Sequence, residues 1–213
     1  FRVTLDGDVE LVSDIRPGAG RGVPSLLTEL NGELYFTAND GIAGREIHRV
    51  TTDGNVELAI DLVPNGSASF YGMAALNNTL YFSADLNNGV GSEIYEYTPG
   101  GSFSLVADVW TGADGSASTD LFGFNGSLYF NGTDDGVNRE LFRYDTSDGS
   151  LTEIILDANR YARPVGFTEI NGSMYFGGQS GIYRVNSDHT ITQLFAASGS
   201  SGVYFTEFDG AVY

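Results

Sequence analysis

One short segment recurs along the chain, and this repetition restricts the fold more than any other feature. With small changes it reads apolar–Asn–Gly–x–Leu–Tyr–Phe, and its copies occupy residues 30–36, 76–82, 124–130 and 170–176. A fifth copy begins at Phe208 and reaches Tyr213. Its tyrosines are 46, 48, 46 and 38 residues apart. A period of about 40–50 residues is typical of the blades of a β-propeller.

Each unit contains four short segments with the alternation and composition of strands. Apolar residues lead into Asn-Gly, Asn-Asn or Asp-Gly, which favour a two-residue hairpin turn. Leu-Tyr-Phe then begins a second strand, and a Gly-rich polar loop follows. Residues 46–50 form a third predicted strand, and residues 56–60 form a fourth after the turn at Asp53-Gly54. The sequence therefore predicts an all-β protein.

The two ends of the chain complement each other. Residues 2–4 align with the third strand at 49–51, whereas Tyr213 aligns with the second strand at Tyr35. We therefore predict a single domain, residues 1–213, that forms a five-bladed β-propeller of four-stranded antiparallel blades. The N- and C-terminal strands would close the last blade and leave no free sheet edge. The units are 1–33 with 208–213, 34–79, 80–127, 128–173 and 174–207. The alternative is a set of units from a longer ring or array.

Charge and composition exclude several classes of function. The chain has 28 acidic residues against ten arginines and no lysine, a formal net charge of −18. Such a surface repels phosphate backbones, so nucleic acid is not an expected partner. No apolar run approaches the roughly 18–20 residues that span a bilayer, so membrane insertion is not expected. The absence of cysteine excludes disulfides and thiol catalysis.

The units resemble the ELWxxDGT repeat of bacterial secreted and surface proteins. The resemblance rests on residues 14–18 (Asp-Ile-Arg-Pro-Gly), on 34–41 (Leu-Tyr-Phe-Thr-Ala-Asn-Asp-Gly), and on 45–47 (Arg-Glu-Ile) followed by 52–54 (Thr-Asp-Gly). The family tryptophan is replaced by His48, Tyr95 and Phe142, and the fourth unit lacks the glutamate. The resemblance implies a propeller-type fold, a secreted or cell-surface location, and membership of a larger multidomain protein. It implies no particular chemistry.

An acidic loop between the second and third strands recurs in three units. Calcium prefers six to eight oxygen ligands from carboxylates, Asn side chains and backbone carbonyls on a turning loop. The sequence thus indicates calcium as a possible cofactor, although no loop has the EF-hand spacing. In the alternative interpretation, Asn and Asp cap the turns by bonding their own backbone. The candidate metal ligands are Asp40, Glu46, Asp85, Asn87, Glu93, Asp134, Asp135 and Glu140.

Two loops carry candidate ligand-binding residues. Trp110, the sole tryptophan, lies in a polar loop, where it would serve as a platform for a sugar or peptide, or as a wedge between blades. Arg160, Tyr161 and Arg163 form a small basic group on an acidic protein. They would recognise carboxylates by bidentate hydrogen bonds or pair with neighbouring acidic residues.

Two classes of function remain from the sequence. The first is a non-catalytic binding, adhesion or scaffold module that is secreted or lies on the bacterial cell surface, with a glycan or protein ligand bound by propeller-face loops. The alternative is a secreted propeller-type glycosidase or lyase. That enzyme would use Glu29, Glu169 and Glu207, which occupy equivalent positions late in the innermost strand. Glycoside hydrolysis needs two carboxylates about 5–10 Å apart in distinct environments.

Overall fold

A computed structural model describes residues 1–112, 114–156, 161–197 and 203–213, and in this part of the chain the regular elements are all β-strands, joined by turns and loops. Four antiparallel sheets of four strands each form the body of the molecule, which confirms the all-β prediction. Within each sheet the strands pair in sequence order, so every connection inside a sheet joins neighbouring strands. No helix long and apolar enough to cross a bilayer occurs in the described residues.

The strand bounds follow the repeat. Sheet 1 contains β3 (Ser25–Leu30), β4 (Glu33–Asn39), β5 (Arg45–Val50) and β6 (Val56–Ile60). Sheet 2 contains β7 (Ser69–Leu76), β8 (Thr79–Asp85), β9 (Ser92–Tyr97) and β10 (Phe103–Ala107). Sheet 3 contains β11 (Thr119–Phe124), β12 (Ser127–Gly132), β13 (Glu140–Asp145) and β14 (Leu151–Ile154). Sheet 4 contains β15 (Val165–Ile170), β16 (Ser173–Gly178), β17 (Gly181–Val185) and β18 (Ile191–Ala196).

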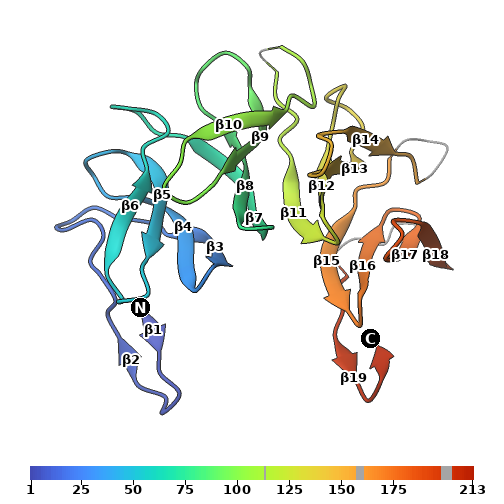
Figure 1. Cartoon of the computed structure of the whole chain (residues 1–213), viewed down its shortest axis with the longest axis horizontal. Coiled ribbons are helices and arrows are strands. Elements are labelled where there is room, and N and C mark those ends of the chain that lie inside the picture. Colours follow the sequence, from blue (N-terminus) through green and yellow to red (C-terminus); the bar gives the residue numbers. More distant parts are fainter. Residues whose placement is uncertain (113, 157–160, 198–202) are drawn as a thin grey trace.

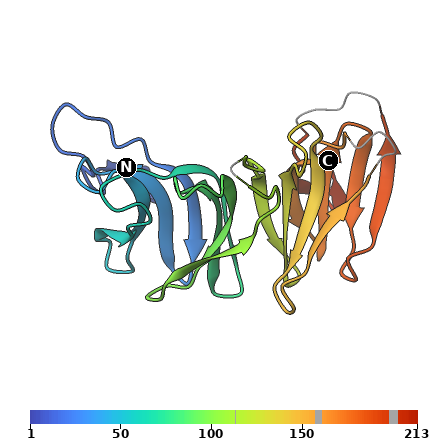
Figure 2. The same cartoon turned by 90° about the horizontal axis from the view of Figure 1, so that it is seen from above.

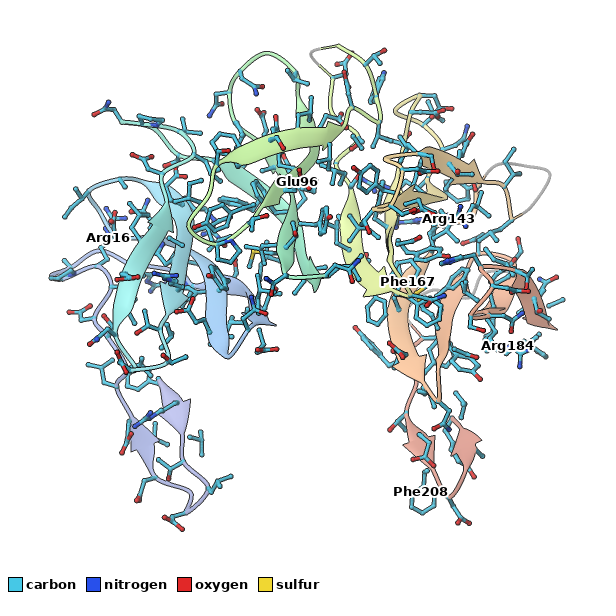
Figure 3. All side chains as sticks on the ribbon, in the orientation of Figure 1. Arg16, Glu96, Arg143, Phe167, Arg184 and Phe208 are labelled. Carbon is cyan, nitrogen blue, oxygen red and sulfur yellow. The ribbon has the colours of Figure 1, made fainter. Side chains whose placement is uncertain are left out.

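The four sheets stand side by side in an arc, like the blades of a propeller (Figures 1 and 2). The first strands β3, β7, β11 and β15 line the inner side of the arc, and neighbouring first strands contact one another. Figure 3 labels Phe167 of β15, whose ring centroid lies 6.3 Å from that of Phe122 in β11. All four first strands carry a register shift near their beginning, which is typical of a β-bulge.

A stacked pair of rings joins the second and third strands of every sheet. Phe36 faces His48 in the β4–β5 register, and their ring centroids are 5.9 Å apart. Sheets 2, 3 and 4 repeat this pair at 5.7, 5.6 and 5.1 Å with the residues Phe82–Tyr95, Phe130–Phe142 and Phe176–Tyr183. Cross-strand aromatic pairs fix the register of a sheet. The third-strand position of this pair is thus filled by a ring in all four sheets.

The hydrophobic core lies between the sheets. Three clusters of buried side chains form, one at each junction between consecutive sheets. The middle strands are therefore buried on both faces, as β8 shows with Leu80, Phe82 and Ala84 in one cluster and Tyr81 in the next. A sheet with two apolar faces needs a neighbour on each side.

The chain ends form two separate hairpins. β1 (Arg2–Val3) pairs with β2 (Val9–Glu10), and β19 (Glu207–Phe208) pairs with β20 (Ala211–Val212), each as a two-stranded sheet. No strand pairing in the described residues joins the two hairpins. They lie on opposite sides of the opening of the arc, so the predicted closed last blade is not formed in this structure (Figure 1).

We expect Gly123→Ala to destabilise the fold, because the first strands approach closely at this position. A Cβ at Gly123 would lie 2.8 Å from the Ala75 carbonyl oxygen and 3.0 Å from the Leu76 Cβ. Overpacking of this kind costs typically about 1–3 kcal/mol. Chemical denaturation measures the loss, and Thr152→Ala on the exposed outer strand β14 is the control. Equal stability of the two variants would contradict the close packing at the inner side of the arc.

Candidate functional site

The candidate site is a pocket of about 290 Å³ on the face where the loops between second and third strands meet the loops between blades. This face lies at the opposite end of the strands from the Asn-Gly hairpins. Loops from three places in the chain contribute to the pocket: β10–β11, β12–β13 and β14–β15. The lining residues are Trp110, Gly115, Ala117, Thr133, Gly136, Val137, Arg139, Tyr161 and Arg163.

Three of the four predicted ligand-binding residues lie in this one pocket. Trp110 comes from the loop before sheet 3, whereas Tyr161 and Arg163 come from the loop after it. The Arg163 guanidinium lies 5.7 Å from the Tyr161 ring centroid, and its Nη1 donates to the Tyr161 hydroxyl at 3.3 Å. The fourth, Arg160, lies outside the described residues.

Trp110 is half-buried and rests on the neighbouring loop. A Cβ at Gly136 would overlap its indole ring, so the ring lies directly against the backbone of the β12–β13 loop. The indole fills space between two loops, and it also forms a wall of the pocket.

The sequence did not single out Arg139 as a pocket residue. Its Nη2 donates to the Ala117 carbonyl at 3.2 Å, and its Nη1 donates to the Asn131 side chain at 3.2 Å. Arg45, in the equivalent place in sheet 1, likewise donates to the Val23 carbonyl and to the Thr37 hydroxyl. The available signal was an arginine directly before the glutamate that opens the third strand in two units.

The three glutamates predicted to bind calcium are buried at the start of their third strands. Glu46, Glu93 and Glu140 are 0–2% exposed. The Glu46 Oε2 accepts a hydrogen bond from the Leu62 amide at 2.8 Å, and the Glu93 Oε2 accepts one from the equivalent Val109 amide at 2.7 Å. These carboxylates therefore tie a sheet to the loop that leads into the next sheet.

The structure places the predicted aspartate ligands at turns. Asp40 Oδ1 accepts hydrogen bonds from the amides of Ile42 and Ala43, both at 2.8 Å. Asp135 Oδ1 likewise accepts from the amides of Val137 and Asn138, and these amides hold the pKa of Asp135 well below its usual range. Capping of their own turns is the role that the alternative interpretation gave them.

The remaining predicted metal ligands lie in the same kind of loop. Asp85 Oδ1 accepts from the Asn87 amide at 2.8 Å, and the Asn87 side chain donates to the Ser67 carbonyl at 3.0 Å. Asp134 is exposed in the β12–β13 loop. Among the residues that the structure describes, no three His, Asp or Glu side chains gather into a group able to hold a metal ion. Calcium binding stays a prediction from the sequence.

The carboxylates that an enzyme would need lie away from the pocket. Glu29, Glu169 and Glu207 are exposed and adjoin the hairpin turns at the far end of the first strands. Glu29 Oε1 accepts from the Gly32 amide at 2.6 Å, and Glu207 Oε1 accepts from the Gly210 amide at 2.8 Å. These two glutamates thus stabilise turns in the same way, which gives no separate environments for an acid and a base.

A second, mostly apolar pocket of about 320 Å³ lies between the N-terminal hairpin and the outer side of sheet 1. Leu34 and Phe36 of β4 line it, together with Phe1 and Leu27. This is the outer side of the first blade in the arc. Among the described residues that line this pocket, Arg2 has the one charged side chain.

Comparison with known proteins supports the fold. No protein-family model matches the chain, and no curated protein matches its sequence. The fold is similar to a gluconolactonase from Xanthomonas campestris, with a TM-score of 0.57 and 16% identity over 87% of this chain and 65% of that one. The nidogen/laminin complex gives a TM-score of 0.57 and 14% identity over 91% of this chain and 72% of that one.

A puromycin-hydrolyzing peptidase from Mycobacterium tuberculosis is also similar, with a TM-score of 0.55 and 13% identity over 83% of this chain and 29% of that one. Identities this low show the fold alone. They support a β-propeller-like arrangement of the four sheets. The chain spans less than two thirds of the length of the gluconolactonase.

We expect Glu46→Gln to flatten the pH dependence of stability. Burial raises the pKa of Glu46 to about 7, and the nearby Asp61 charge also raises it. Since the unfolded chain releases this proton at lower pH, the folded state binds more protons between the two pKa values, and the free energy of unfolding falls as pH rises from about 4.5 to 7. Below that range this glutamate no longer lowers stability.

Thermal melts of the wild type and Glu46→Gln between pH 4 and 8 check this expectation. The melting temperature of Glu46→Gln minus that of the wild type should increase as pH rises through this range. Asp6→Asn removes one exposed carboxylate and serves as the charge-matched control, with a constant difference from the wild type. Parallel profiles for Glu46→Gln and the wild type would show that Glu46 titrates normally.

Proposed function

We propose that the chain is a non-catalytic binding, adhesion or scaffold module of a secreted or cell-surface bacterial protein, and that the loop-face pocket holds its glycan or protein ligand. The observation that carries the proposal is the convergence of Trp110, Arg139, Tyr161 and Arg163 in one pocket from three loops. Aromatic and arginine side chains dominate the energetics of recognition sites. Binding on loops that rigid sheets position is a common use of such scaffolds.

The chemistry of the site favours binding over catalysis. Among the described residues that line the pocket, the polar side chains are two arginines, a tyrosine and a threonine beside Trp110, and none is a histidine or a carboxylate. These groups offer hydrogen-bond donors and aromatic surface, which suit binding. The acidic composition and the absence of cysteine fit an exposed protein that makes no use of thiols. The larger multidomain context remains a proposal that rests on the resemblance of the repeats.

We expect Trp110→Ala to weaken ligand binding by about tenfold or more, because a central aromatic side chain is removed from the pocket. A glycan array and a panel of cell-surface proteins, probed with the intact chain, identify the ligand, and titration gives the Kd. Leu105→Ala, at an exposed site on β10, is the control. If Trp110→Ala binds the ligand as tightly as the wild type, the ligand-binding site lies elsewhere on the protein.

Ring closure into five blades belongs to the same proposal. The Arg2–Glu10 ion pair of β1–β2 matches the Arg49–Glu57 ion pair of β5–β6. The Gly210 amide likewise bonds Glu207 as the Gly32 amide bonds Glu29. The two hairpins thus have the local structure of the two halves of one blade. Both hairpins carry exposed apolar side chains, Val3 on the first and Phe208, labelled in Figure 3, on the second. Such side chains gain a partner when the halves pair.

A cysteine pair tests closure within one chain. Leu34 faces Val50 in the β4–β5 register, and repeat equivalence therefore places Val212 opposite Val3 in the closed blade. The chain has no cysteine, so Val3→Cys with Val212→Cys introduces the only thiols. We expect an intrachain disulfide in the monomer under mild oxidation. Free thiols or disulfides only between chains would contradict closure within one chain.

A further inference from the structure

Two arginines of the pocket are held side by side by the backbone. The Arg163 amide donates to the Arg139 carbonyl at 2.9 Å, so residues of two different loops are fixed next to each other. Burial lowers the pKa of Arg139, and the positive charge of Arg163 lowers it further. Neither guanidinium takes part in an ion pair within the described part of the chain. Two adjacent cations are therefore concentrated on a protein of net charge −18.

The backbone at Arg163 is strained. Its φ is +44°, in the left-handed region that non-glycine residues rarely adopt, and Pro164 follows. The flanking Ala162 is 2% exposed, and its carbonyl accepts a hydrogen bond from the Gln179 amide at 2.7 Å. The same left-handed φ occurs at the equivalent loop positions Val23 and Ala117, at +46° and +43°, so this conformation belongs to the repeat. Only the arginine side chain is particular to this place in the chain.

Comparison with sheet 1 shows that the pocket is specific to one place in the repeat. The same loops occur there, and Arg45 takes the part of Arg139. The equivalent of Trp110 is Arg16, which lies against Gly41. The amide that donates to the Arg45 carbonyl, as the Arg163 amide donates to the Arg139 carbonyl, belongs to Ala68. Arg139 thus belongs to the scaffold that the two sheets share, whereas Arg163 and the indole of Trp110 have no counterpart in sheet 1. Structural inheritance from the repeat does not account for them.

We infer that this pocket binds the carboxylate of an acidic sugar, a pyranose of the uronic-acid type. Arginine recognises carboxylates by planar, charge-assisted hydrogen bonds, and two adjacent guanidiniums lose part of their repulsion when an anion lies between them. The rings of Trp110 and Tyr161 offer apolar surface to the C–H face of a pyranose. The volume of about 290 Å³ is at the lower end of small-molecule pockets, which suits one sugar residue. The inference rests on the proposed function.

The sole tryptophan allows a direct test, because its fluorescence reports on this pocket alone. The intact chain is titrated with glucuronate, with glucose, and with N-acetyl-aspartate at low ionic strength. We expect glucuronate to bind about tenfold or more tightly than glucose, which lacks the carboxylate. Glucuronate should also bind more tightly than N-acetyl-aspartate, which lacks the ring. Added NaCl should weaken glucuronate binding.

Matched variants separate recognition from folding. Arg163→Gln should weaken glucuronate binding about tenfold and leave the affinity for glucose unchanged. Arg139→Gln should do the same, whereas Arg45→Gln loses equivalent hydrogen bonds in sheet 1 and should retain glucuronate binding. Thermal melts verify that all three variants fold. Arg163→Lys should recover only part of the affinity, because lysine lacks the planar fork.

The outcomes distinguish the two proposals. Equal binding of glucose and glucuronate, or equal losses in Arg163→Gln and Arg45→Gln, would overturn the acidic-sugar inference and leave the binding module intact. Tighter binding of N-acetyl-aspartate than of glucuronate would also overturn it, in favour of an acidic peptide. An array that captures no glycan and no protein, together with no fluorescence response to any probe, would overturn the proposed function itself.

Discussion

Each sheet of this protein has two apolar faces, and the rest of the structure depends on covering both. Both rings of an aromatic pair lie on one face of the sheet, as Phe82 and Tyr95 do in the cluster between sheets 1 and 2, whereas Tyr81 packs in the cluster on the other face. A single sheet of this kind is not stable alone, because both of its apolar faces would be exposed to water. Repeated sheets that are arranged radially, side by side, cover the apolar faces of their neighbours.

The same constraint explains the buried glutamates. A loop that crosses from one sheet to the next brings backbone amides into a dry junction, where an unpaired N–H is costly. Glu46 and Glu93 accept hydrogen bonds from those amides, although each carboxylate is itself desolvated. The raised pKa of both groups follows from that desolvation. These glutamates therefore tie each sheet to the loop that leads into the next sheet.

Stacking of the sheets also creates the pocket. The junction loops before and after sheet 3 lie at one end of the strands, and the β12–β13 loop stands between them. The β10–β11 loop carries Trp110 onto Gly136, and the β14–β15 loop carries Arg163 beside Arg139. The repeat supplies a rigid frame, and substitutions at a few loop positions supply the chemistry. Sheet 1 has the same frame with Arg16 in place of Trp110 and no arginine in place of Arg163, so the aromatic wall is absent there.

The sequence by itself determined the strands, their turns and their pairing within each sheet. These features are local, since period-two alternation and the Asn-Gly turns at Asn31 and Asn125 act over a few residues. It also indicated Trp110, Tyr161 and Arg163 as residues out of place on an acidic, polar surface. Only the tertiary structure decided that Glu46 is buried, that Arg139 joins the pocket and that the terminal hairpins stand apart in the arc. Burial and proximity depend on segments distant in the chain, and a local pattern carries no information about which of them meet.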